Sequence, residues 1–311
     1  MTHSQFRSGR LHADNVTLRY DERTISRGLS VSIPDGSFTV IVGPNACGKS
    51  TLLRALSRLL VPSAGQVILD GSSISDLAAK EVARRLGLLP QSSIAPDGIT
   101  VADLVARGRY PHQSFFRQWS KGDEEAVIAA MEATRVTDLS GRQVDELSGG
   151  QRQRVWIAMV LAQETPILLL DEPTTFLDIA HQIELMDLLA DLNRQGRTIV
   201  AVLHDLNHAC RYASHLIAMK DGMIVAEGKP PSIVTEKLVE DVFGLPSVII
   251  PDPVSNTPLI VPKGREVLTG YQAMERSKSE SGDFRYDQGA RSTTRIRLDS
   301  RASNGRWNHR D

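Results

Sequence analysis

A glycine-bearing segment at residues 43–51 has the composition of a phosphate-binding loop. It matches the pattern G-x4-G-K-[ST], in which backbone N–H groups and a helix N-terminus surround a polyphosphate. In such a loop Lys49 would reach the β- and γ-phosphates, and the Ser50 hydroxyl would ligate Mg²⁺. The loop residues predicted to bind nucleotide are Gly43, Pro44, Asn45, Ala46, Cys47, Gly48, Lys49, Ser50 and Thr51.

Two adjacent carboxylates follow a short apolar run much further along the chain. Residues 167–170 read Ile-Leu-Leu-Leu, which is typical of a buried strand, and Asp171 and Glu172 come directly after them. Beside a phosphate loop, Asp171 would hold the Mg²⁺ shell and Glu172 would orient and polarise an attacking water. This chemistry works by positioning and charge neutralisation rather than through a covalent intermediate.

A second turn of small residues precedes another predicted helix. It reads Leu147-Ser148-Gly149-Gly150-Gln151, and such turns before helices bind anions. This turn has no lysine of its own, and the chain already has one phosphate loop. We therefore expect it to serve a nucleotide that is held elsewhere.

The elements that must position these residues alternate between strands and helices. Residues 11–42 are predicted to be rich in β-strand, and residues 38–42 form a short apolar run suited to a buried strand. Residues 52–60 are predicted to form an amphipathic helix with Leu59 on its apolar face. The order strand, phosphate loop, helix is the start of an α/β pattern.

A mainly helical block then interrupts the α/β pattern at residues 92–163. It contains a capping-box-like start at residues 100–103 and a Glu- and Ala-rich segment at residues 123–136. The pattern resumes with strands at residues 167–170 and 198–203, each followed by a predicted helix. We therefore predict an α/β core with a helical insertion.

The last part of the sequence has a different composition. Five prolines lie within residues 245–262, too many for a regular element but compatible with short extended pieces. Residues 265–311 are rich in Ser, Arg, Gly and Asp and poor in apolar side chains, so we predict a mostly disordered tail.

Overall composition excludes several classes of protein. The 311 residues include 36 Lys and Arg against 37 Asp and Glu, and this near-balance argues against a dedicated nucleic-acid binder. Two cysteines, Cys47 and Cys210, cannot make a disulfide framework. The N-terminal residues show no apolar signal segment, and no run of eighteen apolar residues occurs. These features predict a soluble cytosolic protein.

Together the motifs resemble those of the ATP-binding cassette (ABC) ATPases over roughly residues 11–260. Residues 147–151 match the signature motif of that family, in which two copies pair head to tail and each signature closes over the ATP held by the other copy. Tyr20 sits where the family stacks an aromatic ring on adenine. Gln91 matches the glutamine loop, which senses the metal site and the membrane partner; Asp178 matches the aspartate loop across the dimer, and His204 the switch histidine.

The resemblance implies a fold and a division of the chain. The fold would be an ABC-type α/β domain, a RecA-like core with an antiparallel β subdomain and an inserted helical subdomain. Residues 11–91 and 161–245 would form the core, and residues 92–160 the helical subdomain. A proline-rich extension at residues 246–264 and the tail at residues 265–311 would follow.

A finer resemblance points to bacterial importers of iron–siderophore complexes. The segments that carry it are residues 107–113, 173–182 and 204–214, and they look most similar to the ATPases of ferric-enterobactin transporters. That resemblance implies ATP and Mg²⁺ as cofactors and a homodimer. It also implies two integral-membrane permease subunits, an indirect siderophore-binding protein, and a peripheral position on the cytoplasmic face of the inner membrane.

Three features leave choices open. The family usually has glycine where Ala46 stands; a positive φ would cost about 1 kcal/mol there, but we expect a negative φ and a harmless alanine. Cys47 lies beside Lys49 at a helix N-terminus, a setting that lowers a thiol pKa, although it equally suits a small unreactive loop residue. Residues 115–116 and Trp119 fall where the family faces its membrane subunits, and they suit either a partner site or core packing.

Other functions compete with ferric-siderophore import. An ATPase for cobalamin or haem import would carry the same motifs. A mechanical or DNA-associated cassette would carry long coiled-coil arms, whereas only 55 residues separate Gln91 from Leu147 and no heptad run appears. A binding-only cassette would lack part of the catalytic set, and here that set is complete.

Overall fold

The computed structural model describes residues 9–91, 93–113 and 119–264. By their internal contacts the residues divide into a unit that ends at Lys263 and a second unit that begins at Gly264. The predicted tail at residues 265–311 and the apolar residues 115–116 lie outside the described residues. None of the helices in the described ranges is long and apolar enough to cross a membrane.

A six-stranded sheet forms the centre of the first unit. Its strand order is β10-β9-β3-β8-β7-β6, and every pairing is parallel except that of β10 with β9. The strands between the edges are buried along nearly their whole length, as expected for a parallel sheet covered on both faces. Its strands are β3 (Phe38–Val42), β6 (Leu86–Leu89), β7 (Ile167–Asp171), β8 (Thr198–Val202), β9 (His215–Lys220) and β10 (Met223–Gly228).

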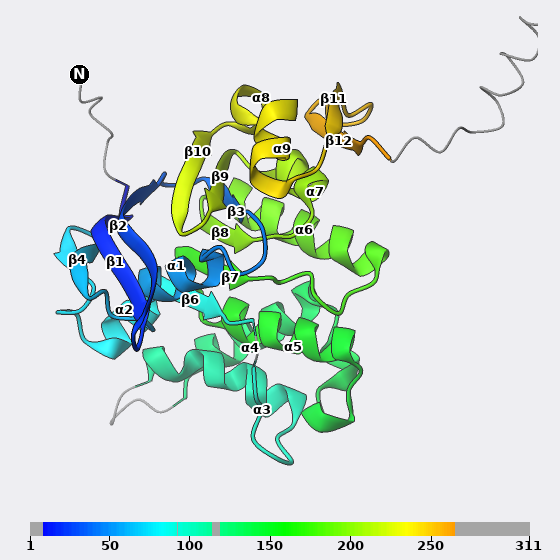
Figure 1. The fold of residues 1–311 in the computed structure, drawn as a ribbon. Coiled ribbons are helices and arrows are strands. Elements are labelled where there is room, and N and C mark those ends of the chain that lie inside the picture. The colour runs from blue at the N-terminus through cyan, green and yellow to red at the C-terminus, as the bar shows by residue number, and fades with distance from the viewer. Residues whose placement is uncertain (1–8, 92, 114–118, 265–311) are drawn as a thin grey trace, which may run out of the picture. The chain divides into compact units, whose positions relative to one another are not determined.

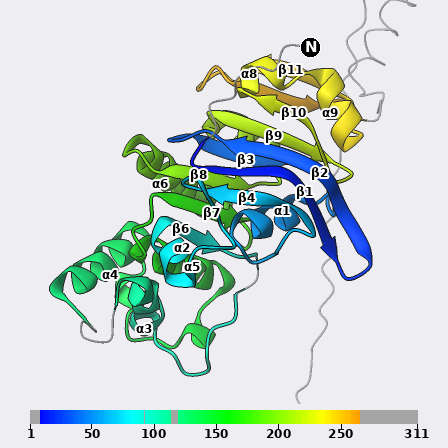
Figure 2. The same ribbon diagram turned by 90° about the vertical axis from the view of Figure 1, so that its left-hand side faces the viewer.

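A second, antiparallel sheet has the order β2-β1-β4-β5. Helix α1 (Lys49–Leu56) contacts both β1 and β7 and lies between the two sheets (Figure 2). Its apolar residues share one buried cluster with the inner faces of both sheets. The strands of the second sheet are β1 (Leu11–Tyr20), β2 (Arg23–Ile33), β4 (Ala64–Leu69) and β5 (Ser72–Ser73).

The predicted helical insertion follows β6 and ends before β7. Three of its helix starts are capped by hydroxyl side chains, from Thr100, Ser120 and Ser148, and the last two form capping boxes. Figure 1 shows these helices grouped beyond the β6 edge of the central sheet. They are α3 (Val101–Ala106), η1 (Arg107–His112), α4 (Lys121–Ala133), η2 (Thr137–Leu139), η3 (Val144–Glu146) and α5 (Gly149–Ala162), with α2 (Ala79–Arg85) preceding β6.

Of the remaining helices, α6 and α7 contact the central strands β8 and β3, whereas α8 and α9 contact β10 and β9 at the other edge of the sheet. A terminal hairpin lies beside α7 (Figure 1). The proline-rich segment forms an antiparallel two-stranded hairpin, which confirms the expectation of short extended pieces. These elements are α6 (Ile179–Arg194), α7 (Leu206–Tyr212), α8 (Pro230–Ile233), α9 (Glu236–Phe243), β11 (Ser247–Pro251) and β12 (Pro258–Pro262).

The helix predicted at residues 52–60 is wrong at both ends. Helix α1 begins at Lys49, inside the phosphate loop, and ends at Leu56. The Ser57 hydroxyl donates to the carbonyl of Arg54, and Arg58 adopts a φ of +66°, so the chain leaves the helix there. Leu59, placed by prediction on the buried face, is therefore 63% exposed.

Candidate nucleotide-binding site

The phosphate-loop residues, Gln91, Glu172 and His204 converge where four parallel strands end. The loops after β3, β6, β7 and β8 leave the same edge of the sheet, because neighbouring parallel strands present their carboxyl ends together. They enclose a cavity of about 470 Å³. The cavity is lined by Arg23, Ile25, Asn45, Ala46, Gly48, Lys49, Ser50, Thr51, Gln91, Glu172 and His204.

Two glycines permit the tight path of the loop between β3 and α1. Gly43 has a φ of +155°, and a Cβ there would lie 2.2 Å from the carbonyl oxygen of Met219. Gly48 has a φ of +107° and is the N-cap of α1. Both positions therefore need glycine, and the backbone N–H groups of the first turn of α1 open onto the cavity edge.

Lys49 is buried, and backbone carbonyl groups of the phosphate loop bind its ammonium group. Its Nζ atom donates to the carbonyl oxygens of Gly43 and Pro44, each at 2.9 Å. These bonds keep the ammonium group beside the cavity that Lys49 lines. The loop thus presents a positive charge and several backbone donors to one volume, which is a suitable environment for a polyphosphate.

Ser50 lines the cavity and connects it to the buried carboxylate of Asp171. The Ser50 hydroxyl donates to Oδ1 of Asp171 over 2.9 Å. Asp171 is 2% exposed, and burial raises the pKa of its carboxyl group, with a smaller upward contribution from neighbouring Glu172. A buried carboxylate that is destabilised by its surroundings, next to a hydroxyl, fits a hard divalent cation such as Mg²⁺.

Glu172 and His204 both line the cavity, and their side chains contact each other. Glu172 follows β7 and His204 lies just past β8, and Nε2 of His204 is 2.7 Å from Oε1 of Glu172. The Glu172 side chain is 12% exposed and its φ is +53°, an unusual conformation for a glutamate. The two predicted catalytic side chains are thereby held in direct contact with each other.

The structure corrects the expectation for Ala46. Its φ is +61°, in the left-handed region, rather than negative. The Cβ of a non-glycine residue in this region costs about 1–2 kcal/mol. Ala46 lines the cavity, so the departure from glycine places a strained residue in the phosphate loop.

The structure also decides the environment of Cys47. Its side chain is buried, with 4% exposed, and points toward the space that a Gly43 Cβ would fill. Burial raises the pKa of the Cys47 thiol, and the charge of Lys49 opposes this only in part. The interpretation of Cys47 as a thiol with a lowered pKa is therefore wrong, and it is a small buried residue of the loop.

The signature residues lie away from this cavity. Ser148 is the N-cap of α5, and its hydroxyl and the Gln151 side chain form a capping box. A Cβ at Gly149 would contact Phe176, which lies two residues before Asp178 and is 75% exposed. Among the described residues that line the nucleotide cavity, none comes from residues 147–151.

Asp178 and Gln91 occupy the borders of the site. Asp178 is the N-cap of α6, and its Oδ1 accepts from the backbone N–H of His181 and lies 2.7 Å from Nδ1 of the same histidine. These hydrogen bonds, the backbone one foremost, lower the pKa of Asp178. Gln91 follows β6 and lines both the nucleotide cavity and a second hollow shared with Gly149 and Phe176.

Sequence reasoning missed two residues of the cavity lining. Arg23 and Ile25 of β2 line the cavity, whereas Tyr20 is not among the described lining residues. Tyr20 ends β1, is 39% exposed, and accepts a hydrogen bond from Arg54, so its stacking on adenine stays a prediction. The only sequence signal for Arg23 and Ile25 was their position just after Tyr20. The register between two neighbouring strands cannot be read from sequence alone, so their place in the cavity lining could not be predicted.

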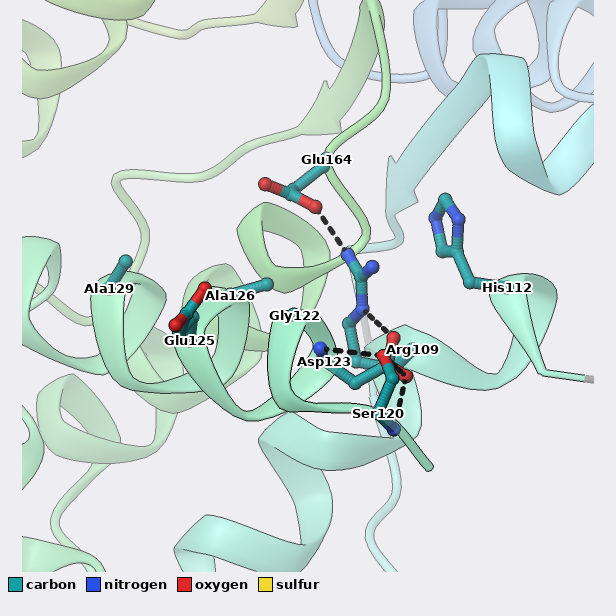
Figure 3. A pocket seen from close by; sticks show the side chains of 9 residues that line it. All are labelled: Arg109, His112, Ser120, Gly122, Asp123, Glu125, Ala126, Ala129 and Glu164. Atoms are coloured by element: carbon teal, nitrogen blue, oxygen red, sulfur yellow. Dashed lines mark hydrogen bonds and ion pairs between the residues drawn. The ribbon is translucent and has the colours of Figure 1, made fainter. Parts of the chain in front are cut away.

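A hollow of about 510 Å³ in the helical insertion is comparably large but lacks this chemistry. Its buried Arg109 is already engaged, donating to Asp123 at 2.8 Å and to Glu164 at 2.7 Å (Figure 3). These bonds tie η1 to α4 and to the segment after α5. The hollow has no phosphate loop, so the ligand chemistry lies at the carboxyl edge of the central sheet.

Comparison with known proteins identifies the family of this chain. The sequence model of the family described as ABC transporter matches residues 26–175. The ferric enterobactin transport ATP-binding protein FepC of Escherichia coli (strain K12) is 62% identical over 257 residues, covering 82% of this chain and 95% of that protein. The chain belongs to the ABC transporter family. This ABC protein is therefore an ATPase, and ATP is its nucleotide.

Other relatives agree with this assignment of the ABC ATPase. The achromobactin transport ATP-binding protein CbrD of Dickeya dadantii (strain 3937) is 54% identical, covering 81% of this chain and 94% of that protein. The dimeric structure of MJ0796, a bacterial ABC transporter cassette, is similar with a TM-score of 0.63 and 31% identity. That likeness covers 70% of this chain and 98% of the cassette.

Proposed function

We propose that this ABC ATPase powers the import of a ferric siderophore of the catecholate, enterobactin-like class across the cytoplasmic membrane. The observation that carries the proposal is the 62% identity to an enterobactin transport ATPase over 95% of that protein. The cargo does not touch this chain in such a system. Its contribution is the free energy of ATP hydrolysis.

Each site residue has a proposed role in the reaction. Lys49 and the loop N–H groups bind the phosphates, and Ser50, Asp171 and Gln91 hold Mg²⁺. When bound, the metal neutralises phosphate charge during the transfer. Glu172 orients the attacking water, and His204, at 2.7 Å from Glu172, links that carboxylate to the γ-phosphate region.

We further propose that two copies of the chain pair head to tail. The signature residues would then cap the ATP of the partner copy, and Asp178 would lie between the copies. Three features support this arrangement: the absence of residues 147–151 from the described lining of their own cavity, the exposure of Phe176, and a dimeric cassette among the relatives. The signature residues are Leu147, Ser148, Gly149, Gly150 and Gln151.

The membrane partner would dock on the segment between α3 and α4. Tyr110 is 64% exposed and Trp119 is 48% exposed, and the ammonium group of Lys80 lies over the Tyr110 ring. Exposed aromatics of this kind suit a contact with two permease subunits. We place the ATPase on the cytoplasmic face of the inner membrane, with a siderophore-binding protein acting on the far side.

The proposed subdivision of the chain follows the roles of its parts. Residues 11–91 and 161–245 would bind and hydrolyse ATP, and residues 92–160 would carry the signature. Residues 246–264 form the terminal extension. A cobalamin or haem importer is the alternative cargo assignment, and a cassette without transport function is a more distant one; both keep the same site chemistry.

Uptake of iron-labelled ferric catecholate by cells lacking this chain tests the cargo. Loss of uptake that is restored by the intact chain, but not by Lys49→Ala, is the expected result. Glu172→Gln should likewise fail to restore uptake. Normal catecholate uptake without the chain, together with loss of cobalamin or haem uptake, would overturn the siderophore assignment and leave the ATPase chemistry intact.

A further inference from the structure

The terminal hairpin is joined to the helix that follows the switch histidine. Helix α7 begins two residues after His204, and the loop between them is exposed at both His204 and Asp205. Asp205 is the N-cap of α7 and accepts from the backbone N–H of His208 at 2.9 Å. The position of His204 therefore depends on how α7 is anchored.

The first anchor is a side-chain amide that pairs with the edge of β12. Oδ1 of Asn207 accepts from the backbone N–H of Ile260 at 2.7 Å, and its Nδ2 donates to the Ile260 carbonyl at 3.3 Å. Ile260 is 5% exposed, so Asn207 satisfies two buried backbone groups at once. The Asn207 amide thus pairs with β12 as the backbone of a neighbouring strand would. The hairpin lies beside α7 (Figure 1).

The second anchor is a charge pair one helical turn further on. Nη2 of Arg211 lies 2.7 Å from Oδ2 of Asp252, whose side chain is 8% exposed. The other carboxylate oxygen accepts from the backbone N–H groups of Val254 and Ser255. These backbone bonds, followed by Arg211, lower the pKa of Asp252 to about 2, so the pair stays charged across the physiological range.

Both anchors lie on one face of α7, because residues 207 and 211 are four apart. Ala209 and Cys210, on other faces, are buried in the large core cluster that also contains Ile260. The helix is thus fixed between the central sheet and the hairpin. The exposed loop before the N-terminus of α7 carries His204 and leads back to the cavity.

We propose that the β11–β12 hairpin positions His204 against Glu172, and that Asn207 and Arg211 are the positioning residues through which it acts. The inference rests on the proposed role of His204 in hydrolysis. Neither residue lines the ATP cavity among the described residues, so loosening α7 should slow hydrolysis and leave ATP binding intact. A purely structural hairpin would instead alter the amount of folded protein alone.

The test compares steady-state ATP hydrolysis by the full-length chain and five variants. Arg211→Ala and Asn207→Ala should each lower kcat at least fivefold while the KM for ATP stays within twofold of wild type. Arg211→Lys, which retains the charge opposite Asp252, should recover at least half of the lost rate. Lys263→Ala is the matched control, because it removes a 3.4 Å ion pair between the hairpin end and Glu236 of α9 without touching α7.

Rates are expressed per ATP-binding site, counted by titration, so that unfolded protein does not contribute. Unchanged kcat in both alanine variants, or an equal loss in Lys263→Ala, would overturn the positioning role. His204→Ala separates this failure from failure of the underlying function. If His204→Ala hydrolyses ATP at the wild-type rate, the proposed role of His204 is wrong; if it is inactive while Arg211→Ala is fully active, only the hairpin inference fails.

Discussion

Replacing Ala46 by glycine should stabilise this protein, although glycine usually destabilises. At a φ of +61° the alanine Cβ costs about 1–2 kcal/mol, and glycine removes that cost. Glycine also gains freedom in the unfolded chain, which opposes the benefit by about 0.4–1 kcal/mol. The expected net gain lies between about 0 and 1.6 kcal/mol, with a centre at about 0.8 kcal/mol, which corresponds to a rise in Tm of roughly 2–3 °C for a domain of this size.

The same substitution should hardly change ATP affinity. If the loop keeps this φ when ATP binds, the strain is the same in both forms and cancels in the binding free energy. We expect the Kd for ATP to change less than tenfold, which corresponds to about 1.4 kcal/mol. Calorimetric unfolding gives the Tm, and equilibrium titration gives the Kd.

Ala129→Gly is the matched control, because Ala129 is exposed on α4 with helical geometry. There glycine should destabilise by about 0.5–1 kcal/mol. Opposite signs for the two variants are the result expected from strain at residue 46. A Tm that falls equally in Ala46→Gly and Ala129→Gly would refute the reasoning.

Two further predictions follow from buried titratable groups. Asp171→Asn should raise the Tm of the nucleotide-free protein at pH 7, because burial raises the pKa of Asp171 and its charged form destabilises the fold. The gain should shrink as the pH is lowered and wild-type Asp171 takes up a proton, and a gain that does not change with pH would contradict this. Maleimide alkylation of Cys47 in a Cys210→Ser background should be slow, because the thiol is buried and its pKa is raised, and ATP should slow it further. Complete alkylation should abolish ATP binding. Rapid reaction at pH 7, or full ATP binding after complete reaction, would contradict the buried position of the thiol.

Much of the site was predictable because its residues follow strands. The apolar runs at residues 38–42 and 167–170 identify two buried strands, and the chemistry-bearing residues come directly after them. Parallel strands bring such residues to one edge, so Lys49, Ser50, Asp171 and Glu172 could be grouped in advance. The prolines at residues 245–262 likewise predicted short extended pieces.

Features that depend on long-range packing were not predictable. The φ of Ala46 and the burial of Cys47 belong to a loop that packs against a segment far along the sequence, because the Gly222 N–H, in the turn after β9, donates to the Cys47 carbonyl at 2.9 Å. The pairing of Asn207 with Ile260 spans 53 residues. Arg23 reaches the cavity from a strand whose alignment no local pattern reveals.

The central claim is that one chain supplies only part of each ATP site and a second copy completes it. The most direct measurement is the mass of Glu172→Gln in solution, by analytical ultracentrifugation, with and without ATP. Because this variant should bind ATP without hydrolysing it, we expect a monomer alone and a dimer at saturating ATP. Ser148→Arg in the same background should abolish the dimer. A chain that stays monomeric at high concentration with ATP bound would contradict the head-to-tail account.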